Sequence, residues 1–206
     1  MRATPDPDTG RSWQLVGGQL ALDLVNTIAW QRNPDRRADR LPDPARLAAW
    51  FVVAAQWHGV DAAVRVSDLD GERGAQVLAA VRELRDACVT VLAAHVDGRS
   101  LCGRAMELLR TCYYESLAAA EVSARLPLQH EVRVRAPEHI TSALGLAVGE
   151  LLRRTDLDRL RRCADEECGW FFLDVSRNRS RRWCDPGDCG NRNRVKAFAA
   201  RARRTA

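Results

Sequence analysis

The stretch Arg161–Arg204 reads RRCADEECGWFFLDVSRNRSRRWCDPGDCGNRNRVKAFAARARR and holds four of the seven cysteines in this 206-residue chain. They form two matched pairs, Cys163 with Cys168 and Cys184 with Cys189, with four residues between the partners of each pair. Two cysteine-containing turns that face each other can place four sulfur atoms at the corners of a tetrahedron, the geometry that Zn²⁺ prefers. The spacing therefore predicts one closed, structural Zn²⁺ site with these four cysteines as its ligands.

Few aromatic side chains are available to hold a core around this site. The aromatic residues between the first cysteine pair and the final helix are Trp170, Phe171, Phe172 and Trp183. Because a module of this size buries little apolar surface, we expect the metal to supply much of its free energy of folding. The alternative interpretation is that the four cysteines are ordinary buried thiols or are paired in disulfides.

The same residues resemble a known zinc finger. The segments Cys163–Asp174, Ser176–Cys184 and Cys189–Arg192 are similar to the CGNR zinc finger. The segment Gly17–Thr27, which reads GGQLALDLVNT, is similar to the opening of the ABATE domain that precedes such fingers in bacterial proteins. The resemblance implies Zn²⁺ as the cofactor, an ABATE domain ahead of the finger, and a role in transcription regulation and the stress response.

The rest of the chain is long and apolar enough for one helical domain. Its apolar content is 46%, and its longest apolar run, Leu47–Ala55, is too short to span a bilayer. The polar opening lacks an export signal, and an odd cysteine count suits a reducing compartment, so we expect a soluble, cytoplasmic protein without membrane contact. The expected domains are a flexible leader over residues 1–10, a mainly helical ABATE-like domain over 11–156, and the zinc finger over 157–206.

Periodicity predicts a mainly α fold with a small β-hairpin, followed by a treble-clef-like or ribbon-like zinc module, and hence an α+β chain overall. Asp43 and Pro44 form a good helix start, and Gly59 a good stop. The other expected elements are a strand over Trp13–Leu20, helices over Ala21–Trp30 and Glu72–Val96, a helix after Ser100, a hairpin within Glu121–Ala136, and a helix from Pro137 through Leu152.

No catalytic motif is visible. The chain has no Gly-rich phosphate loop, zinc-protease helix or nucleophile motif, and its four histidines are scattered, so we expect no enzyme activity. Asp23 and Asn26 could line a pocket, but we expect them on the outer face of the first helix. Arg161, Arg162 or Arg182 could offset the negative charge of a four-thiolate zinc centre.

Positive charge is concentrated at the C-terminal end. Residues 151–206 carry 15 basic and 8 acidic side chains, whereas residues 1–150 carry 17 and 19. A basic module on a near-neutral body is typical of a polyanion-binding protein. We expect a final helix from Gly190 to about Arg204, with Val195, Phe198, Ala199 and Ala202 on its inner face. The expected contacts to double-stranded DNA are Arg177, Arg179, Arg181, Arg182, Asn191, Arg192, Arg194, Lys196 and Arg201.

The sequence thus predicts a DNA-binding transcriptional regulator, with the N-terminal domain used for sensing or oligomerisation. Asn191 and Asn193 could equally be helix-capping residues. Because RNA offers the same phosphates, an RNA-binding module is one alternative, and an adaptor that binds an acidic protein is another. A small-molecule effector and a homodimer are further partners that this interpretation allows.

Overall fold

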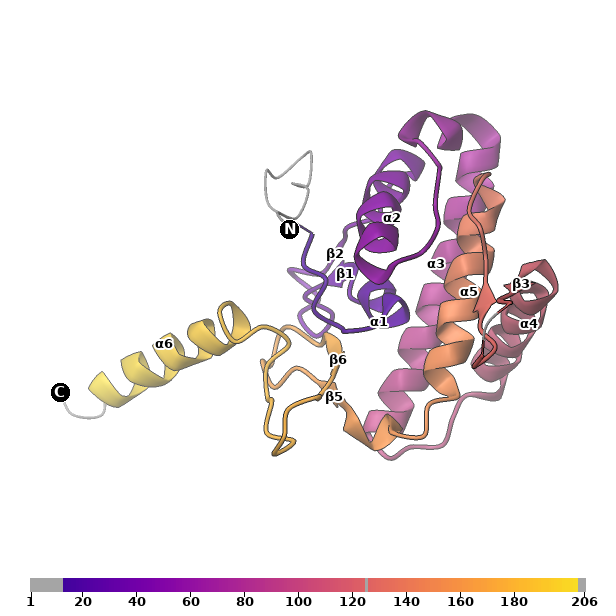
Figure 1. Ribbon diagram of the computed structural model, residues 1–206. Helices are drawn as coiled ribbons and strands as arrows, with labels where there is room; N and C mark the ends of the chain where they lie inside the picture. The colour runs from indigo at the N-terminus through magenta and orange to yellow at the C-terminus, as the bar shows by residue number, and fades with distance from the viewer. Residues whose placement is uncertain (1–12, 125, 204–206) are drawn as a thin grey trace.

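Four long helices build the body of the molecule (Figure 1). They are α2 (Pro44–His58), α3 (Gly71–Val96), α4 (Gly103–Ala119) and α5 (Glu138–Leu152). The structure is a computed structural model that describes residues 13–124 and 126–203, so the expected leader over residues 1–10 lies outside the described residues. Short 3₁₀ turns at Val66–Leu69 and Leu157–Arg159 precede α3 and follow α5.

The start and end of α2 follow directly from its capping residues. The Asp43 side chain accepts a hydrogen bond from the backbone N–H of Arg46 at 2.8 Å, and Pro44 occupies the first turn. Gly59 ends the helix with φ of 72°, a left-handed conformation that suits glycine. The predictions for α2, α3 and α5 are confirmed to within a few residues.

A single large core joins these helices. The inward faces of α3, α4 and α5 pack together, and the short helix α1 (Leu20–Val25) is buried along its whole length. Apolar side chains on one face of each helix drive this packing, because their removal from water is the main favourable term in folding. Among the core residues are Leu22, Trp50, Phe51, Val81, Leu84, Cys88, Leu109, Leu144 and Leu151.

The N-terminal elements differ from the expected strand and long helix. Within the described residues 13–19 there is no strand, and α1 ends at Val25 instead of continuing to Trp30. The chain then forms β1 (Ile28–Ala29), which pairs antiparallel with β2 (Ala38–Asp39). The helix ends early because the residues after Val25 make specific contacts with α3 and with the finger, described below.

A buried arginine anchors the β1–β2 loop to α3. Arg85 is 3% exposed, and its guanidinium donates two hydrogen bonds of 2.8 Å to the carboxylate of Asp39 and one of 3.2 Å to Thr27 Oγ1. Burial opposes ionisation of Asp39, but the hydrogen bonds from Arg85 outweigh it and hold the Asp39 pKa below its usual value. This pair fixes the loop that meets the zinc finger.

The predicted hairpin is present but shorter than the alternating pattern indicates. Only β3 (Glu121–Val122) and β4 (His130–Glu131) pair, in antiparallel register. Val132 and Val134 are buried against the core, whereas Val122 is 53% exposed. Within the described part of the chain, no helix is long and apolar enough to cross a membrane.

Candidate metal centre and nucleic-acid interface

The first cysteine pair lies on the turn of a short hairpin. Strand β5 (Leu160–Arg162) pairs antiparallel with β6 (Phe171–Leu173), and Cys163 follows β5 directly. The N–H of Cys163 donates to Trp170 O at 2.7 Å, which extends the pairing to the turn. Asp165 Oδ1 then accepts the backbone N–H groups of Glu167 and Cys168 at 3.0 and 3.1 Å. Asp165 therefore shapes the turn that presents both sulfur atoms.

An aspartate side chain also shapes the turn of the second cysteine pair. Asp185 Oδ1 accepts the N–H groups of Gly187 and Asp188 at 2.7 and 3.3 Å. Cys189 then begins helix α6 (Cys189–Ala202). A hairpin turn facing the first turn of a helix is a treble-clef-like arrangement, so the predicted α+β zinc module is confirmed. The acidic segment Asp185–Asp188 is a turn-forming segment.

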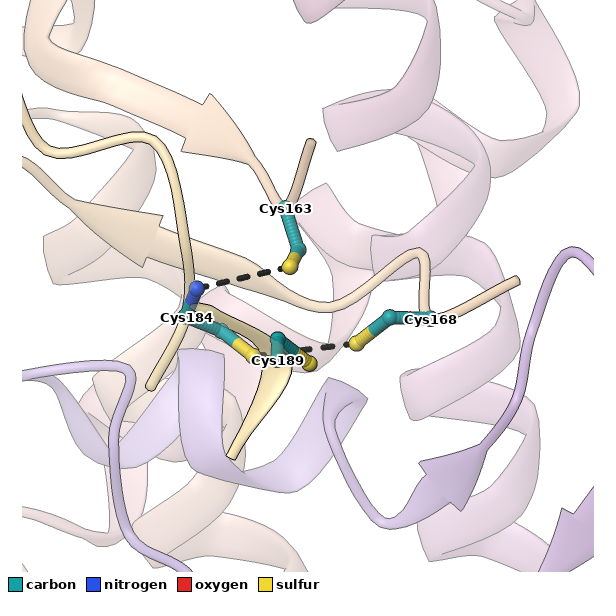
Figure 2. Close-up of side chains that lie close together, drawn as sticks. All are labelled: Cys163, Cys168, Cys184 and Cys189. Atoms are coloured by element: carbon teal, nitrogen blue, oxygen red, sulfur yellow. Dashed lines mark hydrogen bonds between the residues drawn. The ribbon is translucent and has the colours of Figure 1, made fainter. Parts of the chain in front are cut away.

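The four sulfur atoms converge (Figure 2). All four ligand atoms lie within 4.8 Å of one another, and the cysteines are Cys163, Cys168, Cys184 and Cys189. Cys184 Sγ lies 3.6 Å from Cys168 Sγ and 3.5 Å from Cys189 Sγ. A tetrahedral Zn²⁺ with bonds of about 2.3 Å requires sulfur separations of about 3.8 Å, close to these values. Disulfide sulfurs lie at about 2.05 Å, and all four thiols are free, so the disulfide alternative is wrong.

The cluster is buried and chemically suited to a soft divalent cation. The four cysteines are between 1% and 6% exposed. Contacts with the other three sulfurs, and burial, raise the pKa of Cys184. Contacts with the other three sulfurs lower the pKa of Cys163. Four thiolates this close together repel one another, and a Zn²⁺ ion bound to all four removes that repulsion.

Arg192, on the first turn of α6, contacts the cluster. Its Nη2 donates to Cys189 Sγ at 2.9 Å, and its other nitrogens bind Asp165 Oδ2 at 3.1 Å and Asp188 Oδ1 at 2.9 Å. Its guanidinium also lies 4.5 Å from the ring centre of Trp30. A guanidinium in this position stabilises the excess negative charge of a four-thiolate centre.

The three arginines expected to offset this charge contact other groups. Arg161 donates to Asp158 O, and Arg162 pairs with Asp97 at 3.1 Å. The guanidinium of Arg182 stacks over Trp183 at 5.3 Å. Arg192 was missed for this role because its contact with sulfur depends on the three-dimensional position of α6, for which the local sequence has no signal.

The start of α6 is held against both turns. Asn193 Nδ2 donates to Asp165 Oδ2 at 2.6 Å and to Cys189 O at 2.9 Å. A side chain on Gly190 would place its Cβ 3.0 Å from the Trp183 ring. Asn193 therefore has a structural role inside the helix, whereas the N-cap position of α6 is Asp188 and not Asn191 or Asn193.

The finger and the helical body share hydrogen bonds. Asn26 Nδ2 donates to Phe171 O at 2.8 Å, and Phe171 N donates to Asn26 Oδ1 at 2.9 Å. Trp170 Nε1 donates to Ile28 O at 2.8 Å. Since successive strand side chains point to opposite faces, Phe171 and Leu173 join the large core while Phe172 joins the cysteine cluster.

Close backbone contact completes this junction. Gln31 N donates to Cys168 O at 2.9 Å. Gly169 has φ of 77°, and a Cβ there would lie 2.9 Å from Gln31 Cβ, so both its conformation and its surroundings require glycine.

Asp23 and Asn26 are both buried, so their expected place on an outer helix face is wrong. Each is 2% exposed. Asp23 Oδ1 accepts Gly17 N at 2.8 Å, its Oδ2 lies 2.7 Å from His58 Nε2, and burial raises the Asp23 pKa. Their neighbours in LALDLVN are apolar on every side. That lack of a polar face was the sequence signal for burial.

The expected DNA contacts divide into exposed and internally bound residues. Arg177, Arg179 and Arg182 are exposed on the loop after β6, where Arg179 pairs with Asp158. Arg181 instead donates to Val16 O and Trp183 O, both at 3.1 Å, and stacks on Phe172 at 4.2 Å. On α6, the exposed members of the predicted set are Asn191, Arg194, Lys196 and Arg201.

The predicted inner face of α6 is wrong. Val195 is 60% exposed and Phe198 72% exposed. Within α6, only Cys189 and Gly190 are buried. Figure 1 shows the yellow helix projecting away from the body, and among the described residues neither Val195 nor Phe198 belongs to a buried core cluster. Helical spacing identifies which residues share a face, but it does not establish that another element covers that face.

Comparison with family models identifies both parts of the chain. The model for ABATE, described as a putative stress-induced transcription regulator, matches residues 18–155. The model for the CGNR zinc finger matches residues 159–202, which include the four convergent cysteines, and the finger binds zinc. A search of curated proteins finds no match. Since the first match spans more than half of the 206 residues, the chain belongs to the ABATE family and ends in a CGNR zinc finger.

Proposed function

We propose that this protein is a transcription regulator that binds duplex DNA through its zinc finger. The observation that carries the proposal is the charge of α6, whose sequence CGNRNRVKAFAARA has four basic residues and no acidic residue. All but one of these, Arg192, are exposed. We call the loop after β6, which carries the exposed Arg177, Arg179 and Arg182, the arginine loop. An exposed cationic helix together with this loop favours a polyanion with closely spaced phosphates. The regulatory description of the ABATE family supports the same function.

The contacts in this proposal are the exposed members of the predicted set. They are Arg177, Arg179, Arg182, Asn191, Arg194, Lys196 and Arg201. Arg179 and Lys196 have ion pairs with Asp158 and Glu167, and the two basic side chains are about half exposed. Exposed ion pairs contribute about 0–1 kcal/mol, so phosphate can replace these carboxylates at little cost. Arg181 and Arg192 have a structural role in the proposal, because both are bound within the finger.

The zinc centre has a structural role as well. Four cysteine ligands leave no open position for a reacting water, so bound Zn²⁺ supplies folding free energy rather than catalysis. It fixes the first turn of α6 relative to the β5–β6 hairpin through Cys189, Arg192 and Asn193. The direction in which α6 leaves the body is therefore set by the metal centre.

In our proposal, the ABATE domain acts on the finger through Trp30. Its ring stacks with Arg36 at 3.5 Å and with Arg192 at 4.5 Å, and Arg192 contacts the cysteine cluster. In our proposal, an effector or a second protomer that binds the body alters DNA binding through this junction. The measurement is DNA affinity of Trp30→Ala, which should change while the zinc content does not.

The proposal is tested by charge removal in the full-length protein. A variant with Arg177→Ala, Arg179→Ala and Arg182→Ala should bind a fluorescent DNA duplex at least tenfold more weakly at low salt, since three phosphate contacts are lost. Arg104→Ala, at an exposed arginine on α4, is the matched control and should bind as the wild type does.

Competition distinguishes the alternatives. Unlabelled duplex DNA should displace the probe more effectively than double-stranded RNA of the same length or an acidic polypeptide. If the RNA or the polypeptide competes better, the RNA-binding or adaptor function replaces this proposal.

A further inference from the structure

One exposed face of α6 is apolar. Val195 and Phe198 are 60% and 72% exposed, and Ala202 lies one turn beyond Phe198. Asn191, four residues before Val195, falls on the same face and is exposed. We call these four residues, Asn191, Val195, Phe198 and Ala202, the α6 stripe.

The α6 stripe lies on the side of the helix away from the zinc module. Cys189 and Gly190 are the buried residues of α6, and Asn193 is bound to Asp165 and to Cys189 O. At 3.6 residues per turn, Asn193 lies on the opposite side of the helix from Asn191 and Val195. The stripe therefore points outward, on a helix that projects from the body (Figure 1).

Cations border the α6 stripe on both sides. The helical repeat places Arg194 and Arg201 along one edge, and Lys196 and Arg203 along the other. A second copy of this chain would bring the same cations to such a surface, and the like charges would repel. The charge pattern instead fits a partner that is anionic on two sides and has apolar groups between them.

The major groove of DNA has this pattern. Its phosphate backbones form the two edges, and the C5-methyl group of thymine is an apolar group on its floor. An α-helix, about 10–12 Å across, fits a major groove about 12 Å wide. The major groove of an RNA helix is too deep and narrow for this contact.

We propose that the α6 stripe recognises A·T base pairs in the major groove, and this inference rests on the proposed DNA-binding function. Phe198 and Val195 contact thymine methyl groups, while the amide of Asn191 pairs with N6 and N7 of adenine. The cations along both edges bind the phosphates on either side of the groove. The proposed binding partner of the exposed apolar residues is thus the floor of the major groove.

The test exchanges thymine for deoxyuridine, which removes only the methyl group. Tight-binding duplexes are first selected from a random-sequence pool with the zinc-loaded, full-length protein. Each thymine of a selected duplex is then replaced singly. At one or two positions the exchange should weaken binding about fourfold, the value expected for loss of one buried methyl contact.

The variants Phe198→Ala and Val195→Ala identify the residue that contacts each methyl group. Each variant should bind the thymine duplex more weakly, and the deoxyuridine penalty at its own position should disappear. The salt dependence of binding should stay that of the wild type, because no charge is removed. Leu128→Ala, at a 62% exposed leucine of the β3–β4 hairpin, is the control and should keep the full penalty.

Three results would overturn the inference. Equal affinity of the wild type for thymine and deoxyuridine duplexes would show that no methyl group is contacted. A penalty that persists in both variants would place the methyl contact elsewhere. In the third result, the wild type is a dimer without DNA and Phe198→Ala is a monomer, and the variant loses the same affinity for the thymine and the deoxyuridine duplex. The stripe would then be a self-association surface. Absence of binding to any duplex at low salt would instead remove the proposed function itself, together with this inference.

Discussion

The side-chain amide of Asn26 pairs with the backbone of Phe171 as a neighbouring strand would. Its Nδ2 donates to Phe171 O at 2.8 Å, and its Oδ1 accepts Phe171 N at 2.9 Å. The two residues are 145 positions apart in the sequence, and the contact is buried. The opening of the ABATE domain therefore holds the strand that carries the first zinc turn.

Asn26→Ala should lower the free energy of unfolding by about 2–4 kcal/mol, because it leaves a buried N–H and a buried carbonyl of Phe171 without partners. Denaturant unfolding of the zinc-loaded protein measures this loss. Asn178→Ala, at an exposed asparagine of the arginine loop, is the control and should change stability by less than about 0.5 kcal/mol. Equal stability of the two variants would contradict the role given to Asn26.

The protein should bind one Zn²⁺ per chain. Elemental analysis of Cys163→Ser, Cys184→Ser should show loss of the metal, since two of the four ligands are removed. Cys102→Ser, at an exposed cysteine outside the cluster, should retain one zinc per chain. Full zinc content in the double variant would show that other residues bind the metal.

Zinc removal should affect the body only where it meets the finger. On chelation, amide exchange should accelerate over residues 160–192 and also over residues 16–32, whose backbone groups bond to the finger. Helices α3, α4 and α5 should keep their protection, because most of their buried contacts are with one another. Uniform loss of protection would show a single cooperative unit, and loss confined to residues 160–192 would show a finger that unfolds alone.

The Asp39–Arg85 pair should make stability depend on pH. The folded-state pKa of Asp39 is lowered, so its contribution is present above the unfolded pKa of about 3.9 and is lost as pH falls through the lower folded value. Asp39→Asn should cost about 2–3 kcal/mol at pH 7, because Arg85 is buried but keeps its bonds to Thr27 and Asp86. Unfolding of both proteins between pH 7 and 3.5 measures the difference, which should narrow toward the acid end. A constant difference would contradict the linkage.

Local patterns were sufficient to predict the zinc ligands and most helices. Matched spacing identified the four cysteines, and the Asp43–Pro44 start with the Gly59 stop defined α2. These signals lie within a few residues, so sequence carries them directly.

Long-range contacts were not predictable in the same way. Asn26 and Phe171 have no local signal for their pairing, and Arg192 contacts sulfur only because α6 begins at Cys189. Helical spacing predicted that Val195, Phe198 and Ala202 share a face of α6, but the predicted burial of that face was wrong. Among the described residues, the large core forms without any residue of α6, and Val195 and Phe198 stay exposed.

The salt dependence of duplex DNA binding by the zinc-loaded, full-length protein tests the central claim most directly. With about four to six phosphates neutralised by the arginine loop and α6, the logarithm of affinity should fall against the logarithm of salt with a slope of about −4 to −5. Arg177→Ala should reduce that slope by about one, and Arg104→Ala should leave it unchanged. No measurable affinity for any duplex at low salt, where counterion release favours even non-specific binding, would contradict the account.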